Sequence, residues 1–503
     1  MNQMAPNFGD FFFNNVFVTP SGLDAGTVAP GDYVDFELWH SFPDVKELNG
    51  VSESGGDDIE LSGQDSGTLF SFNALSYRVF LNQKNGGLIE YQAAFDISGV
   101  AVTPFALRAS MAMELPELID WSTSPVMLIQ YFTETIESFD GAEQRIALRD
   151  KPRVSVSYQY SLIDEERYQF DSKFINFNSD IIVPIWPMQV YSAHDIFEGD
   201  GSFALSDVNG SIQTSNLFLL TDGANSEIVN VAEVADREVL LKRLVKKNYK
   251  APRLIPCNIG AQQDQSNSYT RSNFLDVHSL AFDLEPELLV RPVPTDDFQR
   301  LGGTPIMPFR PDRSQDISTQ YNRLRETLDP GIGVRNVHSR TTGAIRVFSY
   351  GFRFFSEPER QRFEDFAELN AGSQGEFWFE APAASVEIKN DIFQSSQQLT
   401  IKSSGHFQFA KSKSFALGIA IKLYNGSTQY RTIVSASRNN DGTEVLILNE
   451  PLQNLKVSDV DYIAPLHLGR FDTDDFTYTF QTTSISTITK TIKQLIYADP
   501  QAN

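Results

Sequence analysis

Cysteine is nearly missing from this chain of 503 residues, in which Cys257 is the only one. An intrachain disulfide and a cysteine-based zinc site are therefore excluded. Basic residues are also scarce, because 41 lysines and arginines face 65 acidic residues and leave a formal net charge of −24. Such an acidic chain repels phosphate backbones, so the composition argues against nucleic-acid binding.

Long hydrophobic runs are absent as well. The strongest apolar stretch, residues 181–190, is about ten residues long and interrupted by proline, which is too short for a bilayer span. Residues 1–10 lack the charged start and the apolar core of a signal peptide. We therefore expect a protein without a membrane span, kept in a soluble and reducing compartment.

Catalytic signatures are missing too: there is no P-loop, no nucleotide-binding glycine fingerprint and no His-Glu-x-x-His. The six histidines are scattered singly, and we expect His278 and His467 to be packed residues rather than ligands. Cys257 lies in an apolar strand, which favours a buried thiol over a nucleophile. The sequence predicts no enzyme activity, no metal site and no cofactor.

Charged clusters leave two readings open. The acidic groups at residues 57–60 and 472–475 lack the spacing of a calcium loop, and we interpret them as solvated loops or subunit contacts rather than cation sites. The basic run at residues 242–250 is either a solvated strand end or a contact for an acidic surface.

Aromatic and turn-forming residues, by contrast, are abundant. Hydrophobic residues make up 41% and aromatic residues 12% of the chain, enough for packed cores. Asn-Gly and Asp-Gly pairs separate alternating runs, for example at residues 85–86, 425–426 and 441–442. These dipeptides favour hairpin turns, so the fold class predicted is mainly β with minor α.

Two helices are expected, at residues 164–177 and 356–369, since each begins with acidic residues and the second has Ser356 as a possible cap. Their surroundings resemble each other. Alternating strands at 154–162 and 346–354 precede them, aromatic strands at 181–186 and 376–379 follow, and later segments at 254–260 and 462–469 also match. Closing strands at 277–284 and 476–480 are expected to occupy the same place in the two copies. Four ordered matches predict an internal duplication of a strand–helix–strand unit followed by a small β-barrel.

The length is too great for one ordinary core, so several domains are expected. We predict an N-terminal immunoglobulin-like β-sandwich, a first strand–helix–strand and β-barrel copy, an extended proline-rich connector with a short helix near residues 318–328, and a second copy with the C-terminal tail. Their ranges are residues 1–115, 116–290, 291–336 and 337–503.

One motif is more specific. Asp120-Trp121-Ser122-Thr123 is followed by an Asp-Gly turn and then by Glu143-Gln144-Arg145, Arg149 and Arg153, and Arg470 with acidic residues precedes the last strands. This pattern resembles large tail-tip or baseplate proteins of long-tailed bacteriophages, including those that infect Pseudomonas. The resemblance implies a structural protein of the virion tail tip, assembled in the host cytoplasm, with no catalytic residues.

The arginine spacing suggests how such a protein would assemble. Arg145, Arg149 and Arg153 recur every four residues, which on a single strand places them on one face. Their guanidinium groups suit carboxylates of neighbouring subunits, or Glu137 and Glu143 of their own sheet. We take Trp121, Glu143, the three arginines and Arg470 as the candidate interface or structural motif.

The leading hypothesis is a tail-tip baseplate or hub component that self-associates and attaches the tail tube to other tip or fibre proteins. The alternative is a receptor- or carbohydrate-binding tail protein that contacts the host surface. A glycan-cleaving enzyme would need two acids at hydrolytic spacing, for which we find no support. Because two similar units in each of three chains can match a sixfold ring, we favour a trimer over a hexamer.

Overall fold

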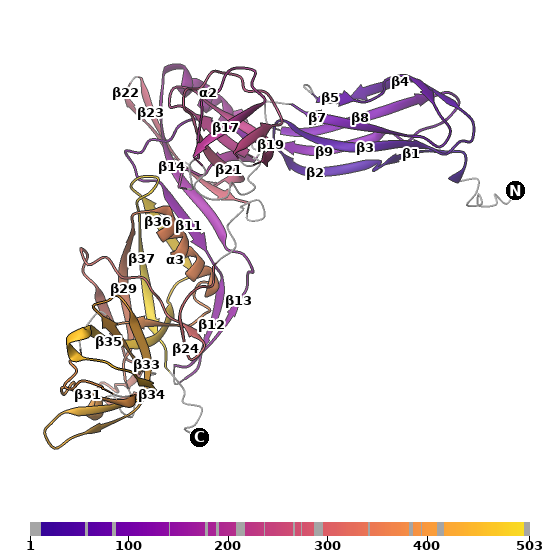
Figure 1. The fold of residues 1–503 in the computed structure, drawn as a ribbon. Helices are drawn as coiled ribbons and strands as arrows, with labels where there is room; N and C mark the ends of the chain where they lie inside the picture. The colour runs from indigo at the N-terminus through magenta and orange to yellow at the C-terminus, as the bar shows by residue number, and fades with distance from the viewer. Residues whose placement is uncertain are drawn as a thin grey trace. The chain divides into compact units, whose positions relative to one another are not determined.

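The computed structural model confirms a mainly β fold with minor α (Figure 1). It describes residues 12–55, 59–82, 87–139, 141–176, 180–187, 191–207, 217–235, 237–264, 267–272, 274–285, 295–340, 343–381, 386–393, 395–409 and 417–496. Both expected helices are present, as α2 (Asp164–Asn176) and α3 (Glu357–Leu369), together with the short α4 (His406–Phe409). In that part of the chain, no helix is long and apolar enough to cross a membrane.

Contacts divide the chain into two compact units that differ from the predicted ranges. Unit 1 holds residues 1–125 and 154–292, and unit 2 holds residues 126–153 and 293–503. The segment at 126–153 was expected in the first copy but packs with the second. The polypeptide therefore passes from one unit to the other three times.

The N-terminal part of unit 1 consists of two antiparallel-rich sheets that share one hydrophobic core. The first sheet has the order β1 (Val16–Thr19), β3 (Asp32–His40), β7 (Ala74–Leu81), β5 (Ile59–Ser62). The second has the order β2 (Gly22–Val28), β9 (Phe105–Met111), β8 (Gly87–Ile97), β4 (Lys46–Ser54), β6 (Gly67–Leu69). Phe36 stacks on Phe105 across the two sheets, with ring centroids 4.0 Å apart. Residues of both sheets therefore contribute to one core.

One predicted hairpin in this region is wrong. The strands on either side of Asn85-Gly86 exist, but β7 belongs to the first sheet and β8 to the second. The turn dipeptide itself lies outside the described residues. Alternation identified the strands correctly, but it could not show that the chain changes sheets between them.

The rest of unit 1 is a module built around α2. Its strands are β10 (Met113–Glu114), β14 (Arg153–Ile163), β15 (Ile181–Pro184), β16 (Tyr191–Ala193), β17 (Ser202–Asp207), β18 (Leu217–Thr221), β19 (Ser226–Ala235), β20 (Glu238–Leu241), β21 (Arg253–Gln262), β22 (Asn267–Ser272) and β23 (Leu275–Leu284). The basic run at 242–250 meets acidic groups of this unit: Lys242 pairs with Asp32 at 2.7 Å, and Arg243 pairs with Glu114.

Unit 2 is a module built around α3. Its strands are β11 (Val126–Gln130), β12 (Thr133–Glu137), β13 (Glu143–Ala147), β24 (Arg300–Leu301), β25 (Thr304–Pro305), β26 (Ser318–Asn322), β27 (Arg325–Leu328), β28 (Asn336–Ser339), β29 (Ile345–Phe354), β30 (Phe377–Glu380), β31 (Ser396–Ile401), β32 (Leu417–Leu423), β33 (Thr428–Arg438), β34 (Glu444–Leu452), β35 (Val460–Phe471), β36 (Asp475–Phe480) and β37 (Ser486–Gln494). Phe363 and Phe366 of α3 are fully buried among aromatic strand residues.

The two modules share their strand pairing. β14 pairs with β23 as β29 pairs with β37, and in both modules the helix follows the first strand of that pair. β15 pairs with β21 as β30 pairs with β35. β18 pairs with β21 as β32 pairs with β35. A duplicated unit would produce this common pattern.

Three local expectations are corrected by the structure. Residues 318–328, expected to include a short helix, form strands β26 and β27. The counterpart of β23 is β37 rather than the segment at 476–480, because β37 is the strand that pairs with β29. Ser356 is the N-cap of α3 but makes no side-chain capping bond; instead the Phe355 amide donates to Glu359 Oε2 at 2.9 Å.

Candidate functional site

The candidate site is a strand and a hairpin that dock on the second module, and we call residues 126–147 the docked arm. Its first strand, β11, adds to the edge of β36 in antiparallel register, with Val126 opposite Thr479 and Gln130 opposite Asp475. The side-chain amide of Gln130 (Nε2) donates to Asp475 Oδ1 at 2.8 Å. The arm therefore extends a sheet of unit 2 by one strand.

A buried ion pair holds the hairpin β12–β13 of this arm. Arg470 Nε donates to Glu143 Oε2 at 2.6 Å and Nη2 donates to Oε1 at 3.0 Å, while Lys493 Nζ donates to Oε1 at 2.6 Å. The Glu143 side chain is only 2% exposed. Burial raises the pKa of Glu143, but the hydrogen bonds from Arg470 and Lys493 outweigh burial and hold it below its usual value.

The three motif arginines do not share one strand face, so that prediction is wrong. Arg145 lies in β13, Arg149 in the following loop and Arg153 at the start of β14. Arg145 Nη2 approaches Glu376 Oε2 at 3.4 Å, and Arg149 Nη1 donates to the Gln130 carbonyl at 3.4 Å. The chain turns out of β13 at Leu148, which breaks the alternation that the spacing implied.

Trp121 lies in unit 1, whereas the other motif residues lie in unit 2. The residue before it fixes a turn: Ser122 donates its amide to Asp120 Oδ1 at 2.8 Å, and Ser161 Oγ donates to Asp120 Oδ2 at 2.5 Å. These hydrogen bonds hold the pKa of Asp120 below its ordinary value. Trp121 is thus half-buried beside a rigid turn that precedes the docked arm.

The acidic cluster at 472–475 contacts the docked arm. Asp474 accepts from the Thr133 amide at 2.6 Å and from the Ser373 hydroxyl at 2.7 Å. Within the described residues, no group of three or more histidines, cysteines or carboxylates is placed to hold a metal ion. Of the other acidic cluster, Asp57 and Asp58 lie outside the described residues.

Lys490, a buried base that the sequence analysis did not single out, contacts this cluster, whereas His467, expected to be a packed residue, is buried beside Arg346 and Phe379. Lys490 is 1% exposed and donates to the Thr473 carbonyl at 2.8 Å and the Asp475 carbonyl at 2.9 Å. Burial lowers its pKa to about 7. His467 is 4% exposed, and burial together with the adjacent Arg346 charge lowers its pKa to about 3.

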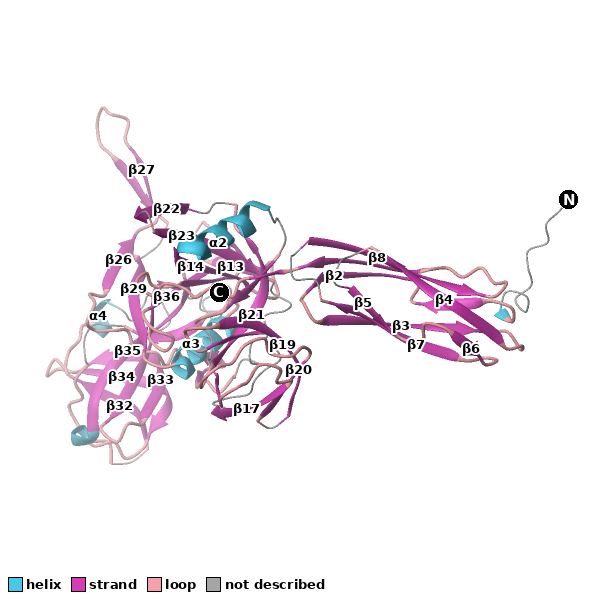
Figure 2. Cartoon of the chain, turned by 90° about the horizontal axis from the view of Figure 1, so that it is seen from above, coloured by secondary structure: helices cyan, strands magenta, loops and turns pink. Residues whose placement is uncertain are grey.

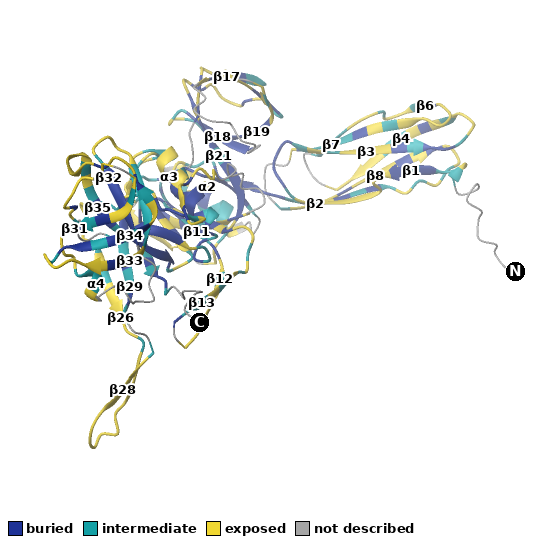
Figure 3. Ribbon diagram, turned by 60° about the horizontal axis from the view of Figure 1, so that its bottom comes forward, coloured by how far each residue is buried: buried dark blue, intermediate teal, exposed yellow. Residues whose placement is uncertain are grey.

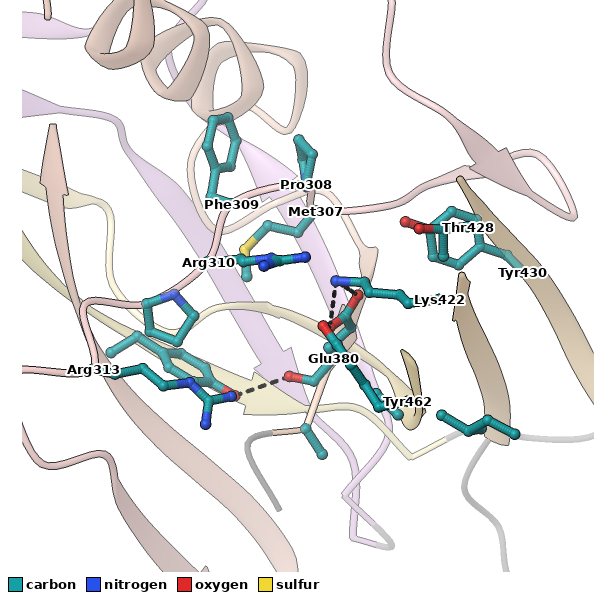
Figure 4. Close-up of a pocket in the computed structure, with 15 residues that line it drawn as sticks. Met307, Pro308, Phe309, Arg310, Arg313, Glu380, Lys422, Thr428, Tyr430 and Tyr462 are labelled. Atoms are coloured by element: carbon teal, nitrogen blue, oxygen red, sulfur yellow. Dashed lines mark hydrogen bonds and ion pairs between the residues drawn. The ribbon is translucent and has the colours of Figure 1, made fainter. Parts of the chain in front are cut away.

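A separate cavity in unit 2 has a volume of about 640 Å³ (Figure 4). Lys422 Nζ lies 2.8 Å from Glu380 Oε1, and the Tyr462 hydroxyl donates to Glu380 Oε2 at 3.3 Å. Burial opposes the charge on Lys422, but its hydrogen bonds to Glu380 and Tyr462 raise its pKa overall. Arg310 and Tyr430 also line the cavity, so its wall combines aromatic faces with charged groups.

Sequence reasoning found Glu143, Arg145 and Arg470 but missed two of their partners. Lys493 pairs with Glu143, and Glu376 pairs with Arg145. Lys493 alternates with apolar residues on β37 like many solvent-facing lysines, so its sequence carries no sign of burial. Only the pairing of β35 with β37, which places Arg470 opposite Lys493, brings the two cations together.

Comparisons with known proteins give no family. No protein-family model matches the chain, and no curated protein matches it. Among solved structures, a DUF4784 family protein from Bacteroides caccae aligns over 94% of this chain and 98% of its own length, with 11% identity and a TM-score of 0.13. A TM-score this low carries no argument about fold or function.

Proposed function

We propose that this chain is a structural component of a bacteriophage tail tip, a baseplate or hub protein. It works by self-association and by attaching the tail tube to other tip or fibre proteins. The observation that carries the proposal is the docked arm. Glu143 and Arg145, which belong to the motif that resembles tail-tip proteins, lie in this arm and form its ion pairs with the rest of unit 2.

The mode of contact supports an assembly role. Strand addition supplies main-chain hydrogen bonds, and the buried Glu143–Arg470 pair fixes the register of the hairpin. Two modules with the same pairing in each chain also suit a trimer that presents six similar faces, which we favour over a plain hexamer. The partners would be tail tube, distal tail and fibre proteins.

Imaging of virions tests this proposal directly. Antibodies against the purified protein should label the tail end of particles from the phage that encodes it. Particles assembled without the protein should lack a tail tip. Labelling of heads or tail shafts, or normal tips on particles that lack the chain, would contradict the proposal.

The cavity of unit 2 favours a second candidate, a carbohydrate-binding tail protein. Sugar rings stack on aromatic side chains, and their hydroxyls bond carboxylates and arginines, which matches Tyr430, Glu380 and Arg310. Titration with oligosaccharides released from host envelopes should then show binding that Tyr430→Ala abolishes. A matched variant outside the cavity, Tyr424→Ala, should bind normally. Equal titration curves for all three proteins would exclude this candidate.

A further inference from the structure

The region before β29 has the same backbone pairing as the region before β14, shifted by 192 positions. The Leu148 amide donates to the Phe132 carbonyl at 2.7 Å, and 192 positions later the Arg340 amide donates to the Leu324 carbonyl at 2.9 Å. The hairpin β12–β13 pairs Thr133 with Ala147, and β27–β28 pairs Arg325 with Ser339, with the same shift. Residues 318–339 are therefore a second arm, equivalent to the docked arm.

The turn that launches each arm is also repeated. The Asp120 amide donates to the Gln159 carbonyl, and the Asp312 amide donates to the Gly351 carbonyl, both at 2.7 Å. The backbone amide of Ser122 donates to Asp120 Oδ1 at 2.8 Å, and that of Ser314 donates to Asp312 Oδ1 at 2.9 Å. Each acceptor lies two residues before its serine. Both arms therefore leave equivalent turns along equivalent backbone paths.

The second arm differs from the first in being more exposed, although its Leu324 and His338 lie beside Gly141 and Phe139 of the docked arm. All residues of β27 and β28 are exposed, and Figure 3 shows this hairpin in the colour of exposed residues as it extends from unit 2. Figure 2 shows the same extension from another direction. Apolar side chains are exposed on it, including Ile332 at 89% and Val334 at 92%. β26 pairs with β29 on one edge, and among the described residues no second strand is in register with its other edge.

The equivalent of the docking edge is also vacant. β36 lies between β37 and β11, and its counterpart in the first module is β22, which pairs with β23. The equivalence rests on register: Thr479 opposes Thr487 as Tyr269 opposes Val277. Every residue of β22 is exposed, and in the described chain the only strand in register with β22 is β23, on its inner edge. Vacant strand edges of this kind readily accept another strand.

We infer that the second arm docks on the first module of a second copy of this chain, with β26 added to the outer edge of β22. The register of the docked arm, transferred by the repeat, places Ser318 opposite Tyr269 and Gln320 opposite Asn267. Such a contact joins different faces of two copies, so it is heterologous and propagates head to tail until a ring closes.

Charge complementarity supports this occupant. Glu143 of the docked arm corresponds to Arg335, and its partner Lys493 corresponds to Asp283, so a negative–positive pair becomes a positive–negative pair. Asp474, which accepts from the Thr133 amide at the start of β12, corresponds to Asp264. Thr133 corresponds to Arg325 at the start of β27, so Arg325 would meet Asp264. Residues 318–340 hold four arginines and two carboxylates in a chain of net charge −24. Arg325, Arg335, Asp264 and Asp283 are all exposed.

Mixing two separately purified full-length variants tests the register. Ser318→Cys in one and Tyr269→Cys in the other place two thiols opposite each other only if the arm of one copy meets β22 of another. Oxidation should then give a covalent dimer across the mixture. The native Cys257 is buried and contributes little background. The matched control, Ser318→Cys with Ser268→Cys, places the thiols on opposite sheet faces and should cross-link at least tenfold less.

Three outcomes overturn the inference: no cross-link in the mixture, equal cross-linking of both pairs, or a cross-link only within single chains that carry both cysteines.

Charge-reversal variants test the inference independently, with self-association measured by sedimentation. Arg335→Glu should weaken self-association at least tenfold, and adding Asp283→Arg should restore it, whereas the exposed Arg108→Glu should have no effect. The inference and the tail-tip proposal fail separately. A chain that self-associates in this way could be absent from virions, and a tail-tip protein could assemble through other contacts.

Discussion

Arg470 and Glu143 form a two-point ion pair across 327 positions of sequence, at 2.6 and 3.0 Å. The pair fixes a hairpin that comes before β14 of the first module to a strand that comes near the end of the second. Because both side chains are almost fully buried, the pair defines where the docked arm sits.

Removal of one partner should therefore loosen the arm. Arg470→Met should lower the free energy of unfolding of unit 2 by about 3 kcal/mol, since a buried carboxylate loses its main partner while Lys493 still neutralises it. Hydrogen exchange should rise at residues 126–147. The double variant with Glu143→Gln should lose less, because it leaves no unpaired charge. An unchanged exchange rate in the single variant would show that β11 alone holds the arm.

Lys490 should make the protein more stable in alkaline solution. Its pKa falls from 10.5 in the unfolded chain to about 7 in the folded one, so between these values the unfolded state binds more protons. The free energy of unfolding should then rise from pH 7 to pH 10.5. Urea titrations at several pH values should show this rise in the native protein and a smaller one in Lys490→Met. Parallel pH profiles for the two proteins would contradict the prediction.

His467 should contribute to acid sensitivity. Its pKa falls from 6.5 to about 3 on folding, so the unfolded state takes up a proton first, and stability is lost as the pH falls from about 6.5 towards 3. His467→Gln keeps a neutral polar group beside Arg346 and should flatten this part of the profile. Thermal melting between pH 4 and pH 7 measures the difference. A native slope retained by the variant would assign the acid sensitivity to carboxylates instead.

Two equivalent glycines allow a matched test of the arms. Gly141 and Gly333 both have positive φ, at 87° and 100°, but a Cβ on Gly141 would lie 2.9 Å from Leu324 and Ile496, whereas one on Gly333 meets nothing within 4 Å. Each alanine variant should lose about 1 kcal/mol from backbone strain, and Gly141→Ala should lose more. Melting temperatures of monomeric protein at low concentration compare them. Equal losses would mean that the neighbours of Gly141 move aside.

The sequence predicted local structure better than partners. The alternation of Val154, Val156 and Tyr158 identified a strand with one buried face, and the acidic start of α3 identified its helix. Neither pattern indicates which strand lies alongside, because alternation describes faces and not edges. The segment at 126–153 was therefore assigned to the wrong module.

The arginine spacing failed for a related reason. A four-residue repeat has one meaning on a continuous strand, and β13 ends before Arg149. The contacts of Glu143 with Arg470 and Lys493 depend on the pairing of β35 with β37, which no short window of sequence contains. Pairing between strands that lie far apart in the sequence could therefore not be predicted from local patterns.

The crossing of the docked arm into unit 2 has a consequence for synthesis. Glu143 leaves the ribosome 327 positions before Arg470, which at about 5–20 residues per second is roughly 16–65 s. During that time the first module can fold, while the arm has no strand to join. β36 and β37 are translated long after the arm and supply the sheet that the arm joins. A nascent chain interrupted before β36 would thus expose both an unattached arm and an unfinished sheet, so translation of these two strands removes two surfaces that could aggregate.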